Sequence, residues 1–193
     1  MNSQIPINDM TFNKLEKACG EENMGGMTTK GWLALDCHIA EWPSLKSNIT
    51  EVADLCKQVG NFVMVNGKYF IPIKAIIRTP HMSAENQGEP EGKSFVPKID
   101  FIVGGASKAQ NMGYMRLLNN ANGVLLWLDN DGNRVQVGSE THPAIFTPSG
   151  DSGANPSDRS EARFSAQTDD FCPGRLYYGS IPLSEGQAVD PIS

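Results

Sequence analysis

The side chains best suited to chemistry are few and scattered. The chain has three histidines, His38, His81 and His142, and none has a second ligand one helical turn away. Because a zinc site gathers several such ligands, no metal site is expected from these residues. Asp129-Asn130-Asp131-Gly132 begins like a calcium-binding loop, but Arg134 stands where an EF-hand needs glycine. This spacing favours a tight turn between two strands.

Nucleophile patterns are equally weak. Residues 150–153 spell Gly-Asp-Ser-Gly, the string around the nucleophile of chymotrypsin-like proteases, but the chain is too short and lacks a matching His and Asp arrangement. The four cysteines fit neither a zinc pattern nor a CxxC motif, so we expect small buried hydrophobes in a reducing cytoplasm. The sequence therefore predicts a protein that is not an enzyme, with no cofactor and no metal.

The charge balance limits the possible partners. The net charge is −6 and the pI about 5.0, which argues against a protein that grips DNA phosphates through clustered Lys and Arg. No apolar run has the length of a membrane span, and residues 1–10 lack the features of a signal peptide. We expect synthesis in a cytoplasm and no membrane anchor.

Most of the chain has the alternation and turn residues of β-strands. Gly31 to Ala40 alternates, which predicts a strand buried on one face. Asn66-Gly67 predicts a hairpin between strands at 61–65 and 68–78. Further strands are expected at 95–103, 124–128, 133–137, 144–147, 162–166 and 176–181.

One helix is expected in the middle of the chain, at 107–119. Its apolar stripe consists of Ala109, Met112, Met115 and Leu118, widened by Leu117. Residues 49–59 fit either a helix or a strand, and residues 14–19 fit a single helical turn.

These elements predict a mainly β fold, a single domain over 1–193. We expect a β-sandwich or barrel with one flanking α-helix and a long hairpin arm. An N-terminal arm is expected at 1–30 and a polar tail at 184–193. The hairpin arm would join 68–78 to 95–103, with the long loop 79–94 at its tip. That loop, which carries Glu85, Glu89 and Glu91, is either an interaction arm or a disordered surface loop.

The second half of the chain resembles a known family. The run from Leu117 to Gly132 is followed by Val135-Gln136-Val137-Gly138-Ser139, then by Pro143-Ala144, Ser152-Gly153-Ala154 and Ser157-Asp158-Arg159 before a closing strand at 161–166. Over about residues 95–182 this order resembles the major tail tube proteins of tailed bacteriophages, especially those infecting Bacteroidota. The loop at 79–94 and the tail after 182 are longer than that family's pattern leads us to expect.

The resemblance implies a structural virion protein of the tail tube and type VI secretion tube superfamily. Its subunits would form hexameric rings that stack helically into a hollow tube, assembled in the bacterial host cytoplasm and found in the virion tail. Its partners would be itself, other tail proteins at the tube ends, and double-stranded DNA that passes without specific binding. An acidic lumen would repel that DNA. Candidate lumen or inter-ring residues are Glu85, Glu89, Glu91, Asp129 and Asp131.

Three other functions stay open from the sequence. One is a tail terminator or connector that forms a single ring. Another is a secretion-type tube protein that carries effectors. The third is a monomeric β-sandwich module that binds carbohydrate through Trp32, Trp42 or Trp127, which would require exposed, coplanar aromatic rings.

Overall fold

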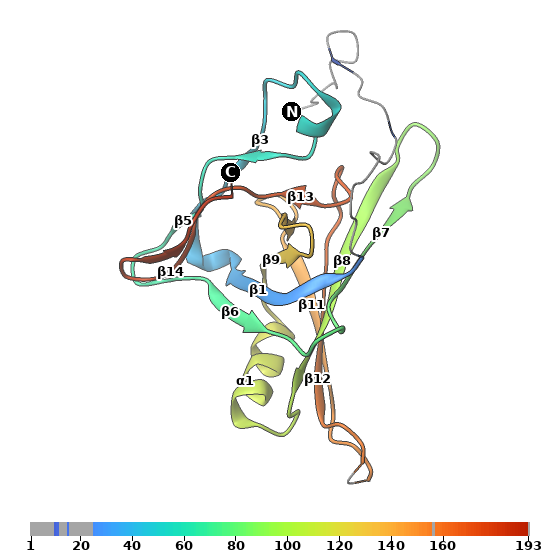
Figure 1. The fold of residues 1–193 in the computed structure, drawn as a ribbon, viewed down its shortest axis with the longest axis vertical. Helices are drawn as coiled ribbons and strands as arrows, with labels where there is room; N and C mark the ends of the chain where they lie inside the picture. The colour runs from blue at the N-terminus through green and yellow to red at the C-terminus, as the bar shows by residue number, and fades with distance from the viewer. Residues whose placement is uncertain (1–9, 12–14, 16–24, 156, 193) are drawn as a thin grey trace.

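The fold is given by a computed structural model that describes residues 10, 11, 15, 25–155 and 157–192 (Figure 1). The helical turn expected at 14–19 and most of the expected N-terminal arm lie outside these residues. Within them, the chain is mainly β with a single α-helix, as the sequence predicted. No helix among the described residues is both long enough and apolar enough to span a membrane.

A nine-stranded antiparallel sheet forms the body of the molecule, and it does not close into a barrel. Seven strands lie in the order β13-β10-β9-β11-β12-β8-β7, while β1 pairs with β9 and β6 pairs with β1. The bounds are β1 Met27–Leu35, β6 Ile71–Lys74, β7 His81–Gln87, β8 Ser94–Gly104, β9 Asn122–Asp129, β10 Arg134–Val137, β11 Ala144–Asp151, β12 Glu161–Gln167 and β13 Arg175–Leu176.

Strands β1 and β9 separate two hydrophobic cores. Leu33 and Trp127 point into the first core, against Phe101 and Phe164 of β8 and β12. Trp32 and Leu126, their neighbours in the chain, point into the second core. The expected strand at 31–40 is therefore buried on both faces rather than one, and it ends at Leu35 in a 3-10 turn, Asp36–His38.

Three small two-stranded sheets complete the described structure. Strand β2 (Ile39–Glu41) pairs with β5 (Val63–Met64), β3 (Ser44–Leu45) with β4 (Gln58–Val59), and β14 (Ile181–Ser184) with β15 (Gln187–Val189). The helix considered for 49–59 is only a 3-10 turn, Val52–Asp54.

The C-terminal segment is not the expected polar tail, because β15 pairs with β14 and Arg134 holds the residue after β15. The buried guanidinium of Arg134 donates to the carbonyls of Gly179 (2.7 Å) and Asp190, and it lies 5.8 Å from the ring centroid of Trp32. Burial lowers the pKa of Arg134. A buried cation thus satisfies backbone carbonyls and orders the end of the chain.

The expected hairpin at Asn66-Gly67 forms a turn but not a hairpin. The amide of Lys68 donates to the carbonyl of Val65 (2.9 Å), and Gly67 has φ 73°. Asn66 keeps a negative φ, so the turn is of type II rather than the hairpin type I′. The flanking strands diverge, since β5 pairs with β2 and β6 with β1.

The helix α1, Ala109–Leu118, lies within the expected range but is rotated from the expected stripe. Asn111 and Leu118 are buried, and Tyr114 and Met115 pack against the first core. Met112 and Leu117, which the stripe included, are 56% and 44% exposed. The apolar stripe was misplaced because Asn111 faces inward, where its amide donates to the carbonyls of Gly104 (3.0 Å) and Gly105 (2.7 Å).

Candidate functional site

The described part of the chain does not gather the side chains that a metal site requires. No group of three or more His, Cys, Asp and Glu side chains there could hold a metal ion. The protease-like string at 150–153 lies where β11 ends and the tip of the β11–β12 hairpin begins. There the carboxylate of Asp151 accepts a hydrogen bond from the amide of Gly153 (2.9 Å), which makes Asp151 part of a turn.

The five candidate acidic residues fall on two different hairpins. Glu85 is in β7, and Glu89 and Glu91 are in the turn that joins β7 to β8; all three are exposed. Asp131 is exposed in the β9–β10 turn, whereas the carboxylate of Asp129 accepts hydrogen bonds from the amide (2.7 Å) and side chain (3.3 Å) of Asn133. Asp129 therefore stabilises its own turn.

The loop expected at 79–94 is instead a strand and a tight turn. Residues 81–87 pair in continuous register with β8, from His81 opposite Asp100 to Gln87 opposite Ser94. The sequence HMSAENQ lacks apolar alternation because most of β7 is exposed at the margin of the sheet. The long arm is thus the β7–β8 hairpin, and the stretch 68–78 contributes β6, which pairs with β1.

Four strands, β7, β8, β12 and β11, form a sheet region with one core-facing side and one polar side. The core-facing side carries Ile99, Phe101, Phe164 and Phe146, and α1 packs on it through Met115. The residues between these in the chain point the other way, because side chains alternate along a strand. On the opposite side the registers place mostly polar residues: His81, Ser83, Glu85, Gln87, Ser94, Lys98, Asp100, Thr147, Ser149, Asp151, Glu161, Arg163, Ser165 and Gln167. Three apolar residues, Val96, Ile102 and Ile145, lie among them, and none of these side chains is buried.

This polar face carries a small excess of negative charge. Its carboxylates are Glu85, Asp100, Asp151 and Glu161, against the cations Lys98 and Arg163. Lys98 pairs with Asp100 at 3.0 Å and Arg163 with Glu161 at 3.0 Å. Since both cations are occupied by carboxylates of the same face, the face offers no free basic patch for phosphate. Such a surface suits contact with water or a passing polyanion rather than its capture.

Among the described residues, no strand pairs with the outer side of β7. Phe95 of β8 exchanges both backbone hydrogen bonds with Asp170 (2.7 and 2.9 Å), so its N–H and C=O face β12. Because these directions alternate along antiparallel strands, Val96 faces β7 and bonds with Glu85, while Met82, Ala84 and Asn86 face away from the sheet. None of these three is proline, so each presents a donor and an acceptor at the edge.

The two long hairpins project from opposite ends of the molecule (Figure 1). The β7–β8 turn adjoins the Ser94 end of β8, and the β11–β12 tip lies beside its Gly104 end. The tip of the β11–β12 hairpin is held by Asp158, whose carboxylate accepts hydrogen bonds from the amides of Asn155 (2.8 Å) and Ala154 (3.1 Å). These hydrogen bonds, that of Asn155 above all, lower the pKa of Asp158.

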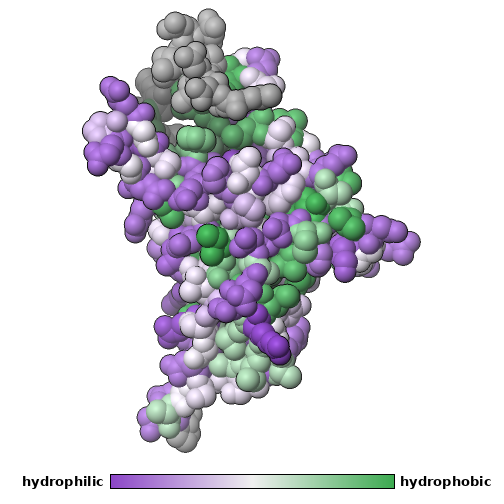
Figure 2. Space-filling view, turned by 180° about the vertical axis from the view of Figure 1, so that it is seen from behind, coloured by the Kyte–Doolittle hydropathy of each residue, from purple (hydrophilic) through white to green (hydrophobic). Residues whose placement is uncertain are grey.

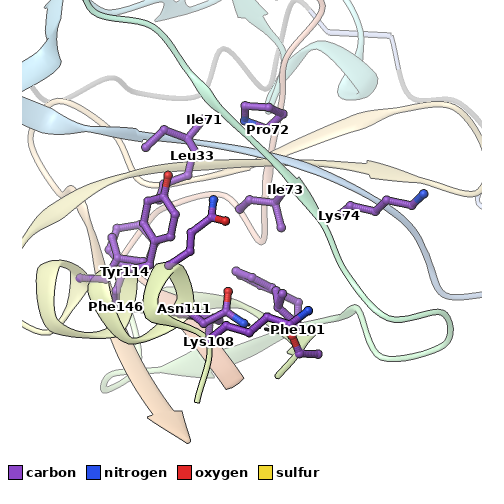
Figure 3. Close-up of a pocket in the computed structure, with 15 residues that line it drawn as sticks. Leu33, Ile71, Pro72, Ile73, Lys74, Phe101, Lys108, Asn111, Tyr114 and Phe146 are labelled. Carbon is purple, nitrogen blue, oxygen red and sulfur yellow. Dashed lines mark hydrogen bonds between the residues drawn. The ribbon is translucent and has the colours of Figure 1, made fainter. Parts of the chain in front are cut away.

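An apolar groove lies between α1 and β6 (Figure 3). It has a volume of about 350 Å³, with Tyr114 and Phe146 on one side and Ile71 and Ile73 on the other. On the rear face, apolar side chains gather on the side that carries α1 and the β14–β15 hairpin (Figure 2).

The aromatic residues do not form a carbohydrate platform. Trp32 and Trp127 are buried, and the indole N–H of Trp127 donates to the carbonyl of Thr28 (2.7 Å). Trp42 is half-buried and packs edge-on against Phe62, with ring centroids 5.6 Å apart. The exposed, coplanar tryptophans that a carbohydrate module requires are absent, because all three serve packing.

No model of a known protein family matches the chain, and neither a curated protein nor a solved structure matches it. The geometry of the polar face, the open edge and the two hairpins therefore carries the functional argument. Sequence reasoning missed β7, because its residues HMSAENQ carry no apolar alternation.

Proposed function

We propose that this chain is a self-assembling structural subunit of a hollow tube of the bacteriophage tail tube type, and not an enzyme. One observation carries the proposal: a polar four-stranded sheet face bounded by the open edge of β7. A sheet with a polar face and an unpaired edge becomes the wall of a channel when copies join edge to edge. The order of elements along residues 95–182, which resembles that family, supports the same function.

Lateral joining depends on the edge. No described strand pairs with the outer side of β7, and a strand of seven residues without proline or lysine is a template for another chain. The other margin of the region is β11, whose inner end pairs with β9 only through Ala144 and Ile145. Joining β7 of one copy to β11 of the next is a heterologous contact, which closes into a ring when the rotation closes.

Axial stacking depends on the hairpins. The β7–β8 and β11–β12 hairpins extend beyond the sheet in opposite directions (Figure 1), so each ring would present one set of tips to the ring above and the other to the ring below. Most tip residues are polar and exposed, as expected for contacts made between folded subunits.

The polar face would line the lumen, and the passing molecule would be double-stranded DNA. Glu85 lies on this face, and Glu89 and Glu91 lie at its end in the β7–β8 turn. Repeated around a ring, their carboxylates repel phosphate and keep DNA from adhering to the wall. The protein would then reside in the virion tail, with other tail proteins capping the tube ends.

Electron microscopy of the purified protein in negative stain, at low and high salt, tests assembly. We expect hollow filaments or stacked rings. Isolated rings that never stack would instead indicate a tail terminator or connector. A protein that stays monomeric at high concentration, even when preformed tube ends are supplied as seeds, would overturn the proposal.

Charge neutralisation tests the role of the lumen. Phage particles that carry Glu85→Gln, Glu89→Gln and Glu91→Gln together should assemble normally and eject DNA more slowly, because the wall no longer repels phosphate. The matched control is Glu51→Gln, Glu140→Gln and Glu185→Gln, three exposed carboxylates outside the face with the same change in net charge. Ejection rates are measured by release of DNA into a fluorescent dye. Equal rates in both triple variants would contradict a DNA-facing role.

A further inference from the structure

Two cysteines that are far apart in the sequence meet in the fold. Cys172 is buried in the loop between β12 and β13, and Cys56 is half-buried just after the 3-10 turn Val52–Asp54. They lie close enough that each thiol shifts the pKa of the other. The Sγ of Cys172 also lies 3.7 Å from the carbonyl oxygen of Leu55, 117 positions away in the chain. Cys37, by contrast, is exposed, contrary to the expectation that the cysteines are buried.

Backbone contacts hold both thiols in place. The carbonyl of Cys56 accepts a hydrogen bond from the amide of Leu176 (2.8 Å), and Lys57 and Leu176 form an isolated parallel β-bridge. On the other side, the carboxylate of Asp170 accepts from the guanidinium of Arg175 (2.6 and 3.1 Å) and from the amide of Cys172 (3.3 Å). The two cysteines therefore lie at a junction that is fixed by hydrogen bonds on both sides.

The surroundings make the two thiols unequal. The hydrogen bond with Cys172 lowers the pKa of Cys56, against an opposing effect of partial burial. The pKa of Cys172 is raised, because that hydrogen bond and burial both disfavour its thiolate. Cys56 is also the more accessible of the two. Since the thiolate is the nucleophile in disulfide exchange, Cys56 is suited to attack and Cys172 to resolve.

We propose that Cys56 and Cys172 form a dithiol site that reacts with small disulfides such as oxidised glutathione. The Cys56 thiolate attacks one sulfur of the small disulfide, whose S–S bond breaks and releases one thiolate. Cys172 then loses its proton to water, and its sulfur attacks Sγ of Cys56 and expels the second thiol. One small disulfide is reduced to two thiols while the two cysteines are oxidised to one disulfide.

The new bond would connect two parts of the molecule that otherwise share few contacts. The lobe formed by β3, β4 and the 3-10 turn between them contacts the large sheet at β13, through Leu55, Cys56 and Lys57. In a reducing cytoplasm the dithiol stays open, and under oxidising conditions it closes. Closure would fix the lobe to the sheet and stabilise the subunit.

Thiol mapping tests the proposal on the unassembled subunit. A variant with Cys19→Ser and Cys37→Ser is treated with oxidised glutathione, alkylated, digested and analysed by mass spectrometry. We expect a Cys56–Cys172 linked peptide and an increase in Tm of roughly 5–10 °C, reversed by dithiothreitol. Adding Cys172→Ser should stop the reaction at glutathione bound to Cys56, and adding Cys56→Ser should leave Cys172 unmodified.

Other outcomes overturn the proposal. If the subunit with both thiols present takes up glutathione on Cys56 without forming the linked peptide, Cys172 does not resolve. If the wild-type protein modifies only Cys37, the pair is not reactive. Peptide mapping of the wild-type protein decides the matter even when a serine variant fails to fold. The measurement does not involve assembly, so its failure leaves the proposed tube function untouched.

Discussion

Two outer strands of the same sheet, β6 and β7, differ in whether their outer edges can pair with another strand. In β6, the amide of Ala75 donates to the carbonyl of Thr29 (2.9 Å), so alternation turns Pro72 and Lys74 outward. Proline has no N–H to offer, and a lysine at an edge discourages pairing. In β7 the outward residues are Met82, Ala84 and Asn86, which present every donor and acceptor. One edge is closed to pairing and the other is open.

The difference indicates which edge the proposed contact between subunits would use. Proteins normally protect edge strands with proline, lysine, bulges or short length, and β6 shows that this chain uses such devices. At the β11 margin, register turns one proline, Pro148, outward beyond the part that pairs with β9, so a strand that pairs there forgoes a single N–H donor. β7 has no such device, and the proposed contact with another copy would therefore use its edge.

The largest effect is expected from closing the open edge. Ala84→Pro removes an N–H that bonds to no described residue, so the fold should survive while ring formation is lost. Ala84→Ser is the matched control, because it keeps the N–H at the same position. Electron microscopy and analytical ultracentrifugation compare the two variants. Tubes of normal yield from Ala84→Pro would show that β7 is not an interface.

The sequence predicted most strands, because β12 alternates and β9 contains a continuous apolar run bounded by turn residues. It failed at β7, where the residues HMSAENQ read as loop because an open edge needs no apolar side chains. It also misjudged β1: Leu33 and Trp32 point into different cores, which a single alternating stripe cannot reveal. The hairpin predicted at Asn66-Gly67 was wrong, because the strands on either side of this turn, β5 and β6, pair with the distant strands β2 and β1 instead of with each other.

The functional surface was only partly predictable. Glu85 was singled out from its charge, and the structure places it on the polar face, but Lys98, Asp100 and Arg163 join that face only through cross-strand register. The contact between Cys56 and Cys172 has no local signal, since it depends on how two loops meet. Asp129 could be recognised as a turn residue from its Asp-Asn-Asp-Gly context.

The next largest effect is expected from disturbing β1, the strand with which β6 pairs. Gly31 of β1 faces Trp127 of β9, and a Cβ at position 31 would overlap the indole ring. Gly31→Ala should lower the free energy of unfolding by about 1–3 kcal/mol, because overpacking displaces β1 and with it β6. Urea denaturation measures this loss. Gly67→Ala in the 65–68 turn, where nothing crowds the new Cβ, controls for a glycine substitution, its own cost arising from the positive φ.

Hydrogen exchange then sharpens the comparison between the edges. Gly31→Ala should speed amide exchange in β1 and β6 and leave the pairing of β7 with β8 unchanged, since no strand pairing joins β6 to β7. Equal acceleration in β7 would mean that the two edges unfold as one unit.

A smaller effect is expected from opening the closed edge. Pro72→Ala restores an outward N–H on β6 without disturbing its bonds to β1, so the folded subunit should remain stable. We expect weak, concentration-dependent association of a kind that Ala84→Pro does not abolish. Sedimentation of the Pro72→Ala, Ala84→Pro double variant measures it. A strictly monomeric double variant would mean that proline is not what keeps β6 free, and Lys74 would be the next residue to change.

The smallest effect concerns the β3–β4 lobe, which belongs to neither edge. Its carboxylate Asp54 accepts a hydrogen bond from Lys46 (2.7 Å) and lies 3.3 Å from Lys57, and these cations hold the pKa of Asp54 well below its usual range. A depressed folded pKa means that the stabilisation is present above about pH 4, the pKa of an unfolded aspartate, and is lost as the pH falls below it. Asp54→Asn should show the loosened lobe already at pH 7, seen as faster proteolysis within 44–59, with no further change in this segment on acidification. Tubes should persist in Asp54→Asn at pH 7, because the lobe takes no part in the β7 edge; their disappearance would show that the lobe contributes to assembly and that the two edges alone do not control it.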